Sequence, residues 1–65
     1  MRFTWGRGHP GEGMFNAGSG DWQLIAMVQG NPEFPSREYI VVIIDGIPEW
    51  QAKFAATIFN AEEPH

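Results

Sequence analysis

Residues 38–62 read EYIVVIIDGIPEWQAKFAATIFNAE, and this stretch decides the fold because a strand pattern gives way to a helix pattern within it. Its first part is almost wholly β-branched and aromatic, and such side chains fit a pleated strand better than a helix. Asp45-Gly46 is a turn signal that should end the strand. Pro48 then suits the first turn of a helix, where its missing N–H costs no hydrogen bond. We therefore predict a strand over 38–45 and a helix over 48–62.

The predicted helix is apolar on two faces. A stripe of large side chains, expected to face the sheet, recurs at spacings of four, four and three residues: Trp50, Phe54, Ile58 and Ala61. The opposite face carries Ala52, Ala56 and Phe59. A helix that is apolar on two faces is usually sandwiched between two layers, so this second face is a candidate interface. Alternatively, the alanines are simply good helix formers and Phe59 is a tolerated exposed aromatic.

Upstream of this stretch lie one clear strand and one weaker one. Turn signals bound residues 21–29, which are mostly apolar and are expected to pair antiparallel with the strand described above. Residues 2–5 alternate polar and aromatic side chains, which suits an edge strand. Residues 6–20 hold six of the eight glycines and predict a loop or a mobile arm. We expect one α+β domain over 1–65: a small antiparallel sheet of two to three strands, with one C-terminal helix packed on one face.

Both faces of the predicted sheet are apolar, although one helix covers only one of them. Side chains alternate between the two faces of a strand, so the second long strand divides into Tyr39, Val41 and Ile43 on one side and Ile40, Val42 and Ile44 on the other. The uncovered face needs a second copy, a different protein, or the N-terminal arm with its apolar residues Phe3, Trp5, Met14 and Phe15. We therefore treat all six strand residues as candidates for a partner or self-association interface.

Phe34 is a further candidate for this interface. It lies between Pro32 and Pro35, which restrict the backbone and favour presentation of the ring as an anchor. The alternative is that the ring tucks under the strand ends and completes the core.

Composition limits the classes of function open to the chain. It has 65 residues and no cysteine, and chains this short usually need a disulfide, a metal or a partner subunit for stability. Four basic and eight acidic residues give a net charge of −4, which argues against broad contact with nucleic acid. The sequence shows neither a secretory signal nor a run of about 20 apolar residues that would span a membrane. We expect a cytoplasmic protein that does not engage membranes.

Candidate chemical motifs are weak. Gly6–Gly11 matches the G-x-G-x-x-G pattern of dinucleotide-binding proteins, but further glycines replace the helix that should follow, and Glu12 would repel a phosphate. An anionic-ligand site that uses Arg7 and His9 is therefore only the alternative hypothesis. The two histidines give no set of three convergent metal ligands, and no hydroxyl forms a recognisable nucleophile–base set with them. We predict no enzymatic activity, no cofactor and no metal.

These observations favour a small protein–protein interaction module. Its mechanism would be burial of the second sheet face, or of a strand edge, against a partner or a second copy in a homodimer. Such a compact, acidic domain would also suit an inhibitor, for instance one that a phage makes against a host or defence enzyme.

Overall fold

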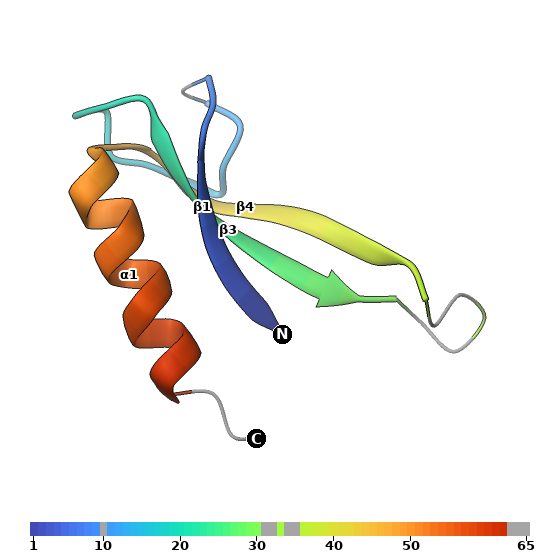
Figure 1. The fold of residues 1–65 in the computed structure, drawn as a ribbon. Coiled ribbons are helices and arrows are strands. Elements are labelled where there is room, and N and C mark those ends of the chain that lie inside the picture. The colour runs from blue at the N-terminus through green and yellow to red at the C-terminus, as the bar shows by residue number, and fades with distance from the viewer. Residues whose placement is uncertain (10, 31–32, 34–35, 63–65) are drawn as a thin grey trace.

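The computed structural model describes residues 1–9, 11–30, 33 and 36–62. Along the chain it contains four strands and one helix: β1 (Arg2–Arg7), β2 (Phe15–Asn16), β3 (Trp22–Gln29), β4 (Glu38–Ile47) and α1 (Glu49–Glu62). The strands form one sheet in the order β1-β3-β4-β2, and α1 packs along β1 and β3 (Figure 1). The α+β class predicted from the sequence is confirmed.

The sheet is larger than predicted and is mixed. β3 pairs antiparallel with β1 and with β4, as expected, and β1 is the edge strand that residues 2–5 indicated. The additional strand is β2, which pairs parallel with β4 and matches Phe15 with Ile44. A two-residue strand inside a glycine-rich segment has no side-chain period, so the sequence pattern did not reveal it.

β4 continues through Asp45-Gly46 to Ile47, so the predicted end at residue 45 is wrong. Trp22 pairs with Ile47 and Leu24 with Ile44, which leaves one extra residue in β4 between these pairs. A second irregularity follows between Leu24 and Ile25. Gly46 has a φ of +70°, a conformation that favours glycine and permits the strand to bend here instead of ending.

The bend in β4 changes which side chains reach the core. Simple alternation would place Ile43 and Ile44 on opposite faces, but both pack against the buried cluster. The fully buried hydrophobic residues among those described are Leu24, Ala26, Ile47, Ala52 and Ala56. Since only Leu24 and Ile47 are large, the core is thin for a domain that must offset the conformational entropy of folding.

The helix packs through the face opposite to the expected one. Ala52 and Ala56 are fully buried against the sheet, whereas Trp50 and Phe54 are exposed, so the prediction that the large stripe faces the sheet is wrong. The reason is the volume between the layers. The sheet already projects Leu24 and other large side chains towards α1, and small side chains on the helix let the two layers approach to native packing density.

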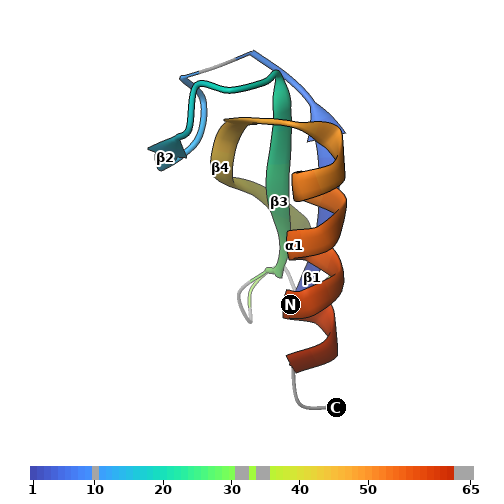
Figure 2. The same cartoon turned by 90° about the vertical axis from the view of Figure 1, so that its left-hand side faces the viewer.

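The start of α1 and the position of the arm complete the fold. The Pro48 carbonyl accepts hydrogen bonds from the N–H groups of Gln51 and Ala52, so the helix begins at Glu49, one residue later than predicted. Seen from the side, α1 lies on one side of β3, and the glycine-rich segment with β2 lies on the other (Figure 2). The sheet is therefore flanked on both sides at the end where β4 bends.

Candidate interaction surfaces

The outer face of α1 carries the two most exposed large apolar side chains of the helix, Trp50 and Phe54, together with Ile58. Trp50, Phe54 and Ile58 are 69%, 62% and 38% exposed. Thr57 and Ala61 lie on the same face and are also exposed and uncharged. We call these five residues the outer stripe. The buried centre of a protein–protein interface is depleted of charged residues and enriched in aromatic ones, and the outer stripe has both properties.

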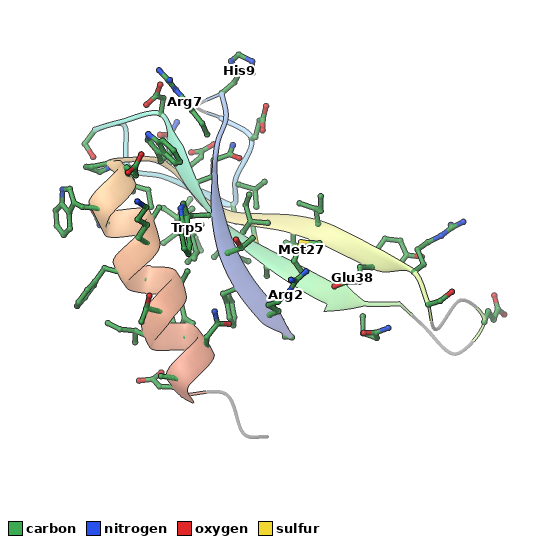
Figure 3. The ribbon with its side chains drawn as sticks, in the orientation of Figure 1. Arg2, Trp5, Arg7, His9, Met27 and Glu38 are labelled. Carbon is green, nitrogen blue, oxygen red and sulfur yellow. The ribbon has the colours of Figure 1, made fainter. Side chains whose placement is uncertain are left out.

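Lys53 of α1 is held beside the outer stripe by two contacts. Its ammonium group lies 2.9 Å from the Glu49 carboxylate, one turn earlier on the helix. The same group lies 6.0 Å from the ring centroid of Trp5 on β1, a partly exposed residue between β1 and the helix (Figure 3). Lys53 therefore points towards β1 and leaves the outer stripe free of charge.

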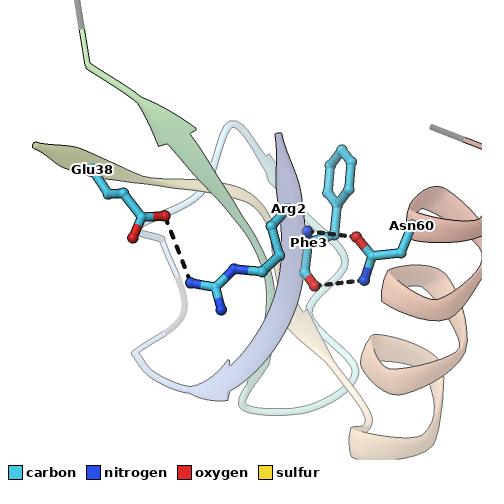
Figure 4. A network of polar contacts seen from close by, with 4 residues as sticks. All are labelled: Arg2, Phe3, Glu38 and Asn60. Atoms are coloured by element: carbon cyan, nitrogen blue, oxygen red, sulfur yellow. Dashed lines mark hydrogen bonds and ion pairs between the residues drawn. The ribbon is translucent and has the colours of Figure 1, made fainter. Parts of the chain in front are cut away.

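Phe59 and Asn60 fasten the C-terminal half of α1 to β1. The ring of Phe59 lies 5.2 Å from the ring of Phe3, measured between centroids. The Asn60 side chain accepts a hydrogen bond from the Phe3 N–H and donates one to the Phe3 carbonyl, both at 2.8 Å (Figure 4). One amide thus substitutes for a neighbouring strand at this point of the β1 edge, which blocks strand addition there.

Asn60→Asp is expected to lower the free energy of unfolding by about 1–2 kcal/mol, because the carboxylate loses the donor and faces the Phe3 carbonyl oxygen. Urea denaturation measures the change. Gln51→Glu is the matched control, since it makes the same chemical change at an exposed position near the favourable N-terminal end of the helix dipole. Equal losses in both variants would show that Asn60 does not hold the helix to β1.

The sheet side opposite α1 carries a second apolar surface, which we call the open sheet face: Ile25, Met27, Ile40 and Val42. Only Ile40, at 66%, is strongly exposed. An Arg2–Glu38 ion pair at 3.6 Å spans β3 beside Met27 (Figure 3, Figure 4). Both charged side chains are largely exposed, so their pairing contributes little stability, but it places charge across this face.

The glycine-rich arm covers the other end of the same sheet side. The backbone N–H groups of Gly11 and Gly13 donate to one carboxylate oxygen of Asp45, at 2.6 and 2.7 Å. Asp45 is fully buried, and its second carboxylate oxygen has no hydrogen-bond partner among the residues that the structure describes. Of the three candidates for covering the second sheet face, the arm therefore supplies part of the cover. It does so with its backbone, because Met14 and Phe15 are exposed.

The alternative ligand site is an open depression of about 440 Å³ lined by Arg7, Gly8, His9 and Asp21. The structure does bring the two predicted anion-binding residues together (Figure 3). However, the Arg7 Nε atom lies 2.9 Å from an Asp21 carboxylate oxygen. This carboxylate offsets the guanidinium charge and would repel a phosphate. No group of three or more potential metal ligands occurs among the described residues.

The remaining predicted interface residues differ in their exposure. Tyr39 and Ile40 are exposed, Val41 and Val42 are partly buried, and Ile43 and Ile44 pack on the core. Ala52 and Ala56 have no exposed surface, so their assignment to an interface is wrong. Phe59 is exposed, and its ring packs at a tilt against the ring of Phe3. Phe34 lies outside the described residues.

Sequence reasoning missed two features, the outward direction of the large stripe and the role of Asp45. A signal for the first was present: alanines four residues apart, opposite three bulky side chains, permit the closest approach of a helix to a sheet. Asp45 offered no such signal. Asp-Gly is typical of a turn, and the amides that bind this carboxylate lie more than 30 residues earlier in the chain.

The chain matches no family model, no curated protein and no solved structure. Within the part of the chain that the structure describes, no helix has the length and apolar character needed to cross a membrane. Any function must therefore be argued from the surfaces described above.

Proposed function

We propose that this chain is a non-catalytic protein–protein interaction module that self-associates through the outer stripe of α1. The observation that carries the proposal is the exposure of Trp50, Phe54 and Ile58 in one uncharged row on a regular helix. Exposed apolar patches of this kind mark interaction sites in small proteins. A helix also presents its side chains rigidly, so little conformational entropy is lost on binding.

The thin core argues for a second copy as the occupant. The domain buries only two large hydrophobic side chains among those described, while its helix leaves the apolar outer stripe exposed. Burial of that row against its own copy would supply the apolar contact that the core lacks, which is a common solution for chains below about 70–80 residues.

The available area is sufficient for a moderate dimer. A fully buried aromatic side chain accounts for about 150–250 Å², so the exposed fractions leave roughly 350–400 Å² on the three large residues of each copy. Together with the stems of flanking side chains, a symmetric pair would bury about 1,000 Å², near the lower limit for a specific interface. We therefore expect a dissociation constant in the micromolar range.

The open sheet face is the weaker candidate for the same role. The Arg2–Glu38 pair would have to be desolvated or displaced, and the arm already contacts Val42 and Asp45 at the other end. The anionic-ligand site at Arg7 has weaker support still, because Asp21 pairs with the arginine. Inhibition of an enzyme is a further hypothesis that would use the same outer stripe with a different occupant.

Phe54→Asp is expected to weaken self-association by about 100-fold or more, because it places a charge at the centre of the apolar row. Light scattering coupled to gel filtration, from micromolar to millimolar concentration, measures the solution mass. Ile40→Asp is the matched control: it introduces the same charge at an equally exposed apolar residue of the open sheet face and should leave the dimer intact.

The dependence of the dimer's dissociation constant on salt concentration provides a second measurement. Each copy carries a net charge of −4, so screening should strengthen a homodimer, whereas it would weaken a complex with a basic partner. A wild-type chain that is monomeric up to millimolar concentration would overturn the proposal and leave a different protein as the occupant. Loss of the dimer in Ile40→Asp, but not in Phe54→Asp, would move the interface to the open sheet face.

A further inference from the structure

We infer that two copies pair through antiparallel α1 helices, with Phe54 at the two-fold axis and Trp50 of each copy at the level of Ile58 of the other. This inference rests on the proposed self-association and adds its geometry. Trp50 and Ile58 lie four positions before and after Phe54. When two helices run antiparallel and are centred on Phe54, Trp50 of one copy therefore lies at the same height along the helix axis as Ile58 of the other.

The sizes of the side chains favour this arrangement. Along the outer stripe, the exposed fraction falls from Trp50 through Phe54 to Ile58. An antiparallel pair places one tryptophan and one isoleucine at each end of the contact. The side-chain volume is then the same at both ends, so the helix axes stay at a constant separation. A parallel pair would place two tryptophans at one end and two isoleucines at the other, which would splay the helices and leave a void.

The helix dipoles favour the same direction. Each helix carries a partial positive charge at its N-terminus and a partial negative charge at its C-terminus. Antiparallel packing places opposite ends side by side, whereas parallel packing places like ends together. The last turn of α1 has no basic residue that would offset the repulsion between two negative C-terminal ends in a parallel pair.

The middle of the contact is free of protruding charge in this geometry. Lys53 is engaged by Glu49 and lies against Trp5, away from the outer stripe. Thr57 donates its hydroxyl to the Lys53 carbonyl at 2.9 Å, so this polar group enters the contact already satisfied. The only groups to be desolvated at the centre are therefore apolar or internally bonded.

Disulfide trapping tests the direction of pairing, and the absence of cysteine from the chain removes any background. In an antiparallel pair, the two copies of residue 54 face each other within disulfide reach, so Phe54→Cys should cross-link on mild oxidation. The two copies of residue 61 are separated by about 20 Å along the axis, so Ala61→Cys should not cross-link. Ile40→Cys should not cross-link in either direction of helix pairing.

The outcomes separate the inference from the proposed function. Cross-linking of both Phe54→Cys and Ala61→Cys would establish a parallel pair and overturn the antiparallel one. Cross-linking only through Ile40→Cys, with a dimeric solution mass, would overturn the inference and leave self-association in place. Because Phe54→Cys removes part of the contact, a spin label on Ala61→Cys gives an independent distance: about 20 Å or more between labels is expected, and close contact would contradict the antiparallel pair. A monomeric mass would contradict the proposed function itself.

Discussion

Asp45→Ala is expected to lower the free energy of unfolding by about 3–6 kcal/mol, since hydrogen bonds to a charged group contribute about 1.5–3 kcal/mol each and two are lost. A 65-residue domain has a total stability of roughly 3–10 kcal/mol, so the variant should be partly or wholly unfolded at room temperature. The buried carboxylate holds the arm at Gly11 and Gly13. Its removal leaves these two amides without their acceptor.

The measurement is thermal and urea denaturation, with amide exchange at Gly11 and Gly13 as the local readout. Asp45→Asn keeps one carbonyl oxygen as an acceptor and should fall between the wild type and the alanine variant. Asp21→Ala removes a carboxylate whose ion pair with Arg7 is exposed, and should cost less than about 1 kcal/mol. Comparable losses at Asp45 and Asp21 would contradict the anchoring role of the buried carboxylate.

Ala56→Asp is expected to unfold the domain, whereas Phe54→Asp on the opposite face of α1 should leave the monomer folded. Ala56 is fully buried against the sheet, and an unpaired buried charge costs about 3–5 kcal/mol. Phe54 is largely exposed, so a carboxylate there stays in water. The contrast is informative because the sequence pattern alone, which places the large stripe against the sheet, predicts that Phe54→Asp is the more destabilising of the two variants.

Circular dichroism and denaturation at concentrations where the chain is monomeric measure this contrast. Ala61→Asp provides a second control, since it makes the same replacement at an exposed alanine of the same helix. A folded Ala56→Asp variant beside an unfolded Phe54→Asp variant would mean that α1 packs through its large stripe. The outer stripe would then not be available to a second copy.

The elements themselves could be predicted because their signals are local. β-branched runs, turn residues and an alanine-rich segment after Pro48 give β3, β4 and α1 nearly their observed bounds. The orientation of α1 could not be predicted in this way. Both faces of the helix are apolar, and the choice between them depends on the volume that β1 and β3 leave free, which no helical period contains.

The candidate site shows the same division. From the sequence one could infer that the chain has more apolar surface than one helix can cover on one small sheet, and that the N-terminal arm, a second copy or a different protein would cover the rest. The residues assigned to that surface were partly wrong, because Ala52 and Ala56 form the face of α1 that packs on the sheet. Ile43 and Ile44, which simple alternation places on opposite faces, are partly buried and both pack against the core at the bend in β4.

By itself, the sequence determined the α+β class, the order of the long elements and the surplus of apolar side chains over a single core. Only the tertiary structure decided where that surplus lies. A buried carboxylate at Asp45 draws the glycine-rich arm onto one end of the open sheet side, and small alanines bring α1 close to the other side. Since both choices depend on contacts between distant segments, the exposed row of Trp50, Phe54 and Ile58 follows from packing and not from local propensity.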